Sequence, residues 1–342
     1  MENTDKVSRG QVKERYEALD GLRGYSAIGI VLMHVLCNGA YEIGGFVFES
    51  LIMSMADLVF LFMVISGFSL CCGYYEKMVS GKLSLGRFYG KRFARVWPFF
   101  ALLCVLDFAI SPSANALYET LANLTLCFGL IPNHHISVIG VGWFLGLVFV
   151  FYFLFPFMCY LLSERKRAWL SFAVALVLNI LCTVRFDVGR ETIVYSGVYF
   201  MAGGMIYLYR QPLRKFADRF GWCILLGIAA VLAAYYFWNK NTAVMLLCTV
   251  PVVIYALKTP RRPFSFLRNP VAKKLGELSM EIYLSHMVIF RVLEKVGLAR
   301  LFPSSGLSFA VAFVVTLTGT VIFAVTVKKL LSVLIDRLGR KK

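Results

Sequence analysis

Long apolar runs are the feature of this 342-residue sequence that most limits how it can fold. The runs are about 17–25 residues each, the length that an α-helix needs to cross the hydrocarbon core of a bilayer. Apolar residues make up 59% of the chain and charged residues only 16%, against roughly 25% charged residues in a soluble domain. Because lipid cannot satisfy backbone polar groups, we expect these runs to be helices.

We therefore predict an all-α, polytopic membrane protein, a single membrane domain over residues 1–342 with no soluble appendage. Residues 1–20 form a polar N-terminal segment that lacks the features of a signal peptide, so we expect it to be retained. Residues 330–342 form a basic tail. The ten predicted spans are 24–40, 50–72, 95–112, 141–162, 168–184, 193–209, 220–238, 242–258, 278–296 and 307–329.

The distribution of basic residues predicts the orientation. With the N-terminus in the cytoplasm, the inner segments together with the adjoining ends of the spans carry 30 of the 36 Lys and Arg residues, as the positive-inside rule requires. We therefore predict cytoplasmic termini and a multi-pass protein of the bacterial cell membrane. The net charge of +17 then reflects topology and attraction to anionic lipid headgroups, and it argues against nucleic-acid binding.

Metal and disulfide chemistry is not indicated. The nine cysteines occur singly, except for Cys71 and Cys72, and no C-x-x-C motif is present. A free cysteine in an apolar run behaves as a small packing residue. The four histidines and the cysteines lack zinc-ligand spacing, so we predict no metal and no bound cofactor.

Ionisable residues inside the spans are the candidates for function, because each costs about 2.5–3.5 kcal/mol at the centre of an inserted helix. Arg23 lies near the inner end of the first helix, and His34 lies eleven residues further along it. Eleven residues rise ~16 Å and turn the helix to within about 20° of the same face. One face should therefore carry a cation at the cytoplasmic mouth and an imidazole near mid-membrane. The alternative role for His34 is an interhelical hydrogen bond.

Asp57 and His286 are predicted at a similar depth in other spans. A carboxylate at that depth needs a partner, and we expect a His or Arg on a neighbouring helix. Asp57 could orient His34 and raise its basicity, or it could form a structural pair. His286 could share the site with His34 or tie helices together, and the second role is favoured.

Arg92 and Arg95 lie three residues apart at the inner mouth of the third span. The guanidinium group is a planar fork that suits phosphate, although anchoring at the membrane surface is the ordinary role of such arginines. Arginines at the mouth, with His and Asp deeper in, suit the transfer of an acyl group from a nucleotide thioester entering from the cytoplasm.

Five segments resemble, in order, the motifs of the acyltransferase-3 family of integral-membrane acyltransferases. The resemblance spans residues 17–330. The first is "LDGLRGYSAIGIVLMH", with its Arg, ten residues, His pattern at Arg23 and His34. The others are "DLVFLFMVISGFSL" with Asp57, "RFARVWP" with Arg92 and Arg95, "GWFLGLVFVFYFLFP" with Trp143 and Tyr152, and "GELSMEIYLSHMVI" with Tyr283 and His286.

The resemblance implies a ten-helix enzyme that moves an acyl group, usually acetyl, from acyl-CoA to a hydroxyl of a glycan or other cell-surface molecule. It implies catalytic roles for His34 and Arg23, with Asp57 as a third candidate. Arg92 and Arg95 would hold the acyl-CoA donor. Trp143, Tyr152, Tyr283 and His286 would bind substrate or support the site.

The sequence departs from the family at one place and leaves other functions open. Many members carry a Glu-Glu-Gln stretch where this chain has Val148, Phe149 and Val150, so the role of those carboxylates does not carry over. Many also carry an extracytoplasmic domain, which we do not expect here. The alternatives are a transporter of an acyl group or anionic solute that uses the same His and Asp, and a non-catalytic scaffold.

Overall fold

The predicted all-α class is confirmed in the part of the chain that the computed structural model describes, where every regular element is a helix. The described residues are 15–131, 139–237, 244–260, 265–298, 301–302 and 304–339.

A helix forms at each of the ten predicted spans. Helical turns at 47–57 and 71–79 extend α2 at both ends, and short helices α5 (Ala114–Leu124) and α11 (Pro270–Glu277) join longer ones. The main helices are α1 (Glu17–Asn38), α2 (Leu58–Leu70), α4 (Leu85–Ile110), α6 (Trp143–Leu162), α7 (Arg165–Leu181), α8 (Ile193–Leu208), α9 (Arg210–Phe237), α10 (Met245–Ala256), α12 (Ser279–Lys295) and α13 (Ser305–Gly339).

Seven helical runs in the described ranges are long and apolar enough to cross a membrane. The helices at the other three predicted spans are shorter, with 16 residues in α8, 12 in α10 and 17 in α12. At ~1.5 Å per residue, 16 residues extend about 24 Å, which is less than a ~30 Å hydrocarbon core. The chain is a polytopic membrane protein. The count of ten spans and the cytoplasmic position of the termini stay predictions.

Helix boundaries differ from the predicted spans at both ends of the chain. Helix α1 begins seven residues before the predicted first span, because Glu17 and Asp20 complement the positive end of the helix dipole. His34 consequently lies near the C-terminal end of α1 rather than at its middle. Helix α13 runs to Gly339, so most of the predicted basic tail is helical. Residues 1–14 and 340–342 of the predicted terminal segments lie outside the described residues.

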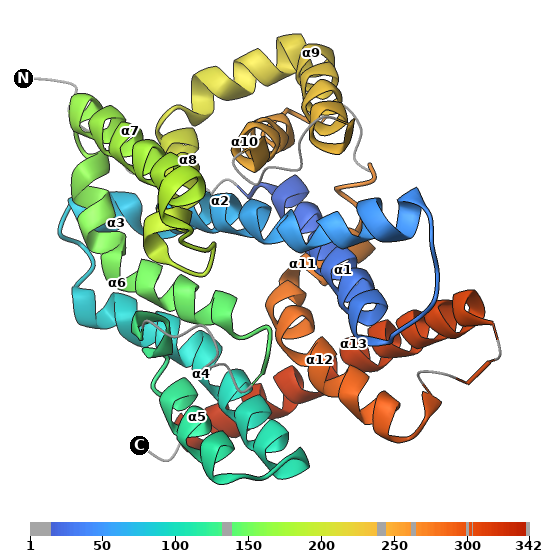
Figure 1. The fold of residues 1–342 in the computed structure, drawn as a ribbon. Helices are drawn as coiled ribbons and strands as arrows, with labels where there is room; N and C mark the ends of the chain where they lie inside the picture. Colours follow the sequence, from blue (N-terminus) through green and yellow to red (C-terminus); the bar gives the residue numbers. More distant parts are fainter. Residues whose placement is uncertain are drawn as a thin grey trace, which may run out of the picture.

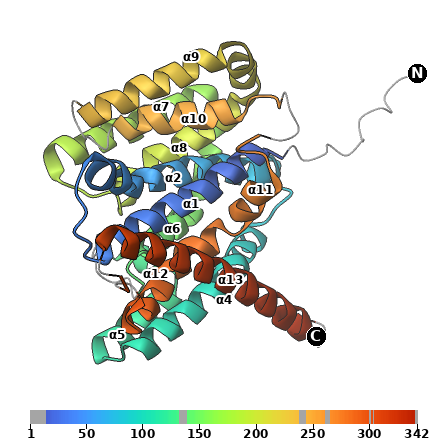
Figure 2. The same cartoon turned by 90° about the vertical axis from the view of Figure 1, so that its right-hand side faces the viewer.

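Helices α1 and α2 occupy the centre of the molecule, as both views show (Figure 1; Figure 2). Of the most apolar stretch of α1, 61% of the residues are buried, against 11% in the run that contains α7. Helices α7 and α9 therefore present mostly apolar side chains outward, as expected where protein meets lipid. The C-terminal part of α13 extends away from the other helices (Figure 2).

Glycines allow α2 and α8 to pack along each other at backbone distance. A Cβ atom on Gly67 would lie 2.3 Å from the carbonyl oxygen of Phe200. A Cβ atom on Gly203 would lie 2.2 Å from the carbonyl oxygen of Val64. Small residues at such positions are the usual device for close helix packing in membranes.

We predict that Gly203→Ala destabilises the protein by about 1–3 kcal/mol, because the added methyl forces α2 and α8 apart. Gly197→Ala is the matched control on the same helix, since its Cβ would meet no atom within 4 Å. The measurement is thermal unfolding of the purified protein in detergent. Equal melting temperatures for the two variants would contradict the proposed close packing.

Candidate active site

A backbone contact between α1 and α11 aligns the helices that carry the two central histidines. A Cβ on Gly276 would lie 2.1 Å from the carbonyl oxygen of Asp20, and one on Gly24 would lie 2.9 Å from the nitrogen of Gly276. His34 follows Gly24 by ten residues, and His286 follows Gly276 by ten residues. The chain passes from α11 into α12 between Gly276 and His286, so the contact at Gly24 and Gly276 determines where α12 begins beside α1.

The two histidines form a pair whose protons can be assigned from their partners. Nδ1 of His286 lies 2.7 Å from the carbonyl oxygen of Tyr283, and Nε2 of His286 lies 3.4 Å from Nδ1 of His34. A carbonyl only accepts, so Nδ1 of His286 carries a proton and its Nε2 is the acceptor. Nδ1 of His34 then donates, at a long distance for a hydrogen bond, and Nε2 of His34 keeps a lone pair. His286 thus orients His34, the role that was considered for Asp57.

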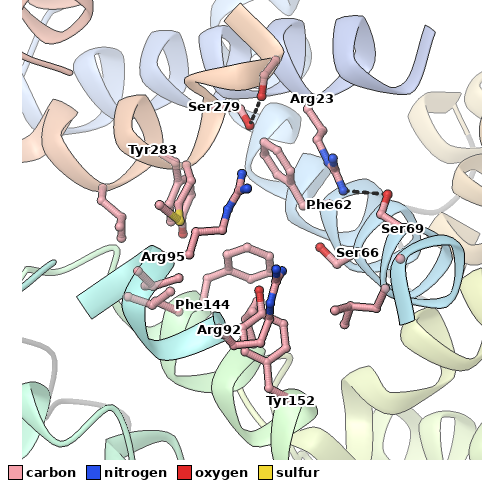
Figure 3. Close-up of a pocket in the computed structure, with 18 of the residues that line it drawn as sticks. Arg23, Phe62, Ser66, Ser69, Arg92, Arg95, Phe144, Tyr152, Ser279 and Tyr283 are labelled. Carbon is pink, nitrogen blue, oxygen red and sulfur yellow. Dashed lines mark hydrogen bonds between the residues drawn. The ribbon is translucent and has the colours of Figure 1, made fainter. Parts of the chain in front are cut away.

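A pocket of about 310 Å³ opens on the side of the bundle where α1 begins (Figure 3). This volume is at the lower end of the range for small-molecule sites. Arg23, Arg92 and Arg95 line it from α1 and α4, together with the predicted Tyr152 and Tyr283. The structure therefore brings five of the predicted site residues to one cavity.

Arg23 is held in the pocket wall by α2. Its Nη2 atom donates to the hydroxyl of Ser69 at 2.9 Å and to the carbonyl of Ile65 at 3.3 Å. Its Nη1 atom lies 3.9 Å from Asp20. Figure 3 shows Arg23 and Ser69 on the side of the cavity facing the other two arginines.

Arg92 and Arg95 reach the pocket from one turn of α4 and keep unused donors. Arg92 bonds to the hydroxyl of Tyr74 and lies over the rings of Tyr74 and Tyr152, yet its buried Nε has no partner among the described residues. Arg95 makes no hydrogen bond or ion pair with any residue that the structure describes. Tyr74 is supplied by the π-helical turn Cys71–Tyr75, a kind of turn that is frequent at functional sites.

Glu277 is the one carboxylate among the described residues that line the pocket. Its charge is compensated by an arginine that does not itself line the pocket. Arg15, just before α1, donates to Glu277 at 2.9 Å and to Asp20 at 3.0 Å. The Arg15 hydrogen bond lowers the pKa of Glu277 below its ordinary value, so Glu277 is ionised at neutral pH. The pocket is therefore cationic and suited to a ligand with several negative charges.

Asp57 pairs with an arginine, but Arg190 lies in the loop before α8 and not on a neighbouring helix as predicted, and Asp57 makes no hydrogen bond to His34. Its Oδ1 lies 3.0 Å from Nη1 of Arg190, and its Oδ2 accepts from Tyr235 at 2.9 Å. Both carboxylate oxygens are thus engaged by residues other than His34. Arg190 also lies over the ring of Trp143, 5.5 Å from its centroid, so the predicted Trp143 belongs to this cluster and not to the pocket lining. A catalytic role for Asp57 stays a prediction.

Sequence reasoning missed several residues of the site. The sequence does mark Arg190 as unusual, because it is one of the few basic residues on the predicted outer side, where the positive-inside rule disfavours them. It does not mark Glu277 or Arg15, since charges in polar segments are common. The aromatic residues Phe62 and Phe144 line the pocket as well, and they could not be distinguished from other apolar positions.

The chain belongs to the acyltransferase-3 family, because the family model described as an acyltransferase domain matches residues 16–326. The match covers every described residue that lines the pocket, and it includes both central histidines. The protein is thus a membrane acyltransferase. No curated protein and no solved structure matches the chain.

The Asp57 cluster yields a prediction about stability. Arg190→Ala leaves a carboxylate that is only 11% exposed without its counter-ion, so we expect a marked loss of thermal stability. Asp57→Asn in the same chain removes the uncompensated charge and should restore part of that loss. Melting temperatures of the two single variants and the double variant test this. Additive losses would show that the two residues do not act as a pair.

Proposed function

We propose that this protein is an O-acyltransferase that moves an acyl group, in the first instance acetyl, from cytoplasmic acyl-CoA to a hydroxyl of a cell-surface or exported glycan. The family supports acyl transfer in general. One observation carries the finer proposal. Arg23, which lines the three-arginine pocket, and His34, which His286 orients, lie on one face of α1. We propose that the pocket faces the cytoplasm, following the charge asymmetry of the sequence, and that the membrane is a bacterial cell membrane.

The donor assignment is supported by charge and shape. The phosphates of acyl-CoA carry several negative charges, and arginine forks bind phosphate through paired charge-assisted hydrogen bonds. Arg95 is exposed and has no hydrogen-bond or ion-pair partner among the described residues, so its guanidinium group is available for this purpose. Tyr74 and Tyr152 offer aromatic faces beside Arg92 for the uncharged parts of the donor.

In this reaction His34 acts as the general base. Nε2 of His34 takes the proton of the acceptor hydroxyl as its oxygen attacks the thioester carbon. The carbon–sulfur bond breaks, a carbon–oxygen ester bond forms, and the proton on His34 passes to the departing thiolate. His286 is a positioning residue: its Nε2 accepts from Nδ1 of His34, which keeps the lone pair of His34 on the other nitrogen and supports the imidazolium while it exists.

The proposal is tested with purified protein in detergent, labelled acetyl-CoA and candidate glycans. We expect release of CoA together with labelled ester, without any ion gradient. If no acceptor supports CoA release, and vesicles containing the protein show gradient-driven uptake of an anionic solute, the transporter alternative would replace the enzyme.

We predict that His34→Ala lowers kcat by about 10²–10⁴-fold while the protein still inserts and folds. His286→Ala should also lower kcat with little change in KM, because the donor pocket is untouched. His286→Gln keeps an acceptor for Nδ1 of His34 and should recover part of the activity. A Gln variant no better than the Ala variant would reject the positioning role of His286. Full activity of His34→Ala would reject the base assignment.

Neutralisation of Glu277 yields a second kinetic prediction. Arg15→Ala leaves Glu277 unpaired in the pocket, so we expect a higher KM for acyl-CoA and an unchanged kcat. Glu277→Gln in the same chain removes the exposed carboxylate and should return KM toward the wild-type value. Steady-state kinetics of the single and double variants measure this. A double variant with the KM of Arg15→Ala would mean that Arg15 acts on donor binding by another route.

A further inference from the structure

We propose that Phe62, Phe144 and Tyr283 form an aromatic collar between the arginine pocket and the histidine pair, and that Phe144 is the residue that sets the acyl-chain length accepted. This inference rests on the proposed function and adds to it the selection of the acyl group. The three rings come from three helices, α2, α6 and α12, and all three line the pocket (Figure 3).

The rings are in mutual contact. Ring centroids are 6.1 Å apart for Phe62 and Phe144, 6.2 Å for Phe62 and Tyr283, and 5.5 Å for Phe144 and Tyr283. These separations are within the range of paired aromatic side chains. The collar thus closes one side of the pocket with packed aromatic surface.

Tyr283 connects the collar to the histidine pair. The ring of Tyr283 is 6.0 Å from the ring of His286, and the Tyr283 carbonyl holds Nδ1 of His286. Tyr283 is therefore both a wall of the pocket and a neighbour of the histidine pair. His34 itself does not line the pocket.

The face of α1 between the pocket and His34 is closed as well. Ala27 and Ile30 follow Arg23 at four and seven residues on the same face, and they are 0% and 1% exposed. A thioester bound by the arginines cannot reach Nε2 of His34 along this face while the neighbouring side chains keep their positions. An aromatic ring of the collar has to move, and the space that it vacates limits the length of the acyl group that can reach His34.

Phe144 is the ring that is least restrained. The hydroxyl of Tyr283 donates to the carbonyl of Val141 at 3.0 Å, and Tyr283 is 5% exposed. Phe62 is 7% exposed and sits within α2 at the centre of the bundle. Phe144 is half-buried, has no polar group to anchor it, and is the second residue of α6. Its rotation about the side-chain bonds opens the collar without moving a helix.

The experiment measures kcat/KM for acetyl-, butyryl- and hexanoyl-CoA with one acceptor. The wild type should prefer acetyl. Phe144→Ala should raise the hexanoyl-to-acetyl ratio by about tenfold or more, as expected when a pocket gains room for added methylenes. Phe144→Leu should give a smaller rise, and Phe144→Trp should lower the ratio. Phe157→Ala, on the outer face of the same helix and 58% exposed, is the matched control and should keep the wild-type ratio.

The outcomes separate this inference from the proposed function. No turnover by the wild type with any acyl-CoA would reject the function itself. An active wild type with the same ratio in Phe144→Ala, Phe144→Leu and the control would reject the collar alone. Folded Phe144 variants that lose acetyl and hexanoyl transfer equally would also reject it, because a size filter changes the ratio.

Discussion

The contact between α1 and α11 at Gly24 and Gly276 is the constraint on which the site depends. It allows no Cβ on either residue, and it sets the register of α1 against the α11–α12 pair. His34 and His286 meet ten residues beyond this contact, His34 within α1 and His286 after the turn from α11 into α12. A shift of one residue along either helix would turn one imidazole by about 100° and separate the pair. Backbone contact at one end therefore determines side-chain chemistry at the other.

Two ion pairs, one before His286 and one after it in the sequence, hold helix α12 in place. Lys328 of α13 lies 2.6 Å from Glu281, five residues before His286, and Arg291, five residues after, lies 2.5 Å from Asp107 of α4. Each carboxylate is less than 10% exposed, so losing either cation would leave a buried charge. Such pairs are costly to assemble in an apolar interior, and they restrict α12 to one rotation. A fixed α12 is what the hydrogen bond between the two histidines requires, because a small displacement of an orienting residue has a large effect on rate.

The length of the apolar runs predicts most of the helices, and the depth of ionisable residues within the runs predicts part of the site. Apolar runs located helices at all ten predicted spans, but not the lengths of α8, α10 and α12, which depend on packing. Arg23, Arg92 and Arg95 could be grouped from charge and position in the sequence, and they do line one pocket. The partner of Asp57 could not be chosen from the sequence, because Arg190 lies in a loop whose path is set by tertiary contacts. The pairing of His34 with His286 depends on helix register, which no single span contains.

Val148 shows how a departure from the family pattern fits the charge balance of the pocket. It lines the cavity at the position where the resemblance leads us to expect an acidic stretch. An acid there would share the cavity with Arg92 and Arg95 and would compensate part of their charge. With Val148 in place and Glu277 bound by Arg15, three guanidinium groups face the cavity without a free carboxylate among the described residues that line it. Charge attraction in a site with apolar walls is stronger than in water, so this arrangement favours the most highly charged ligands and disfavours neutral ones.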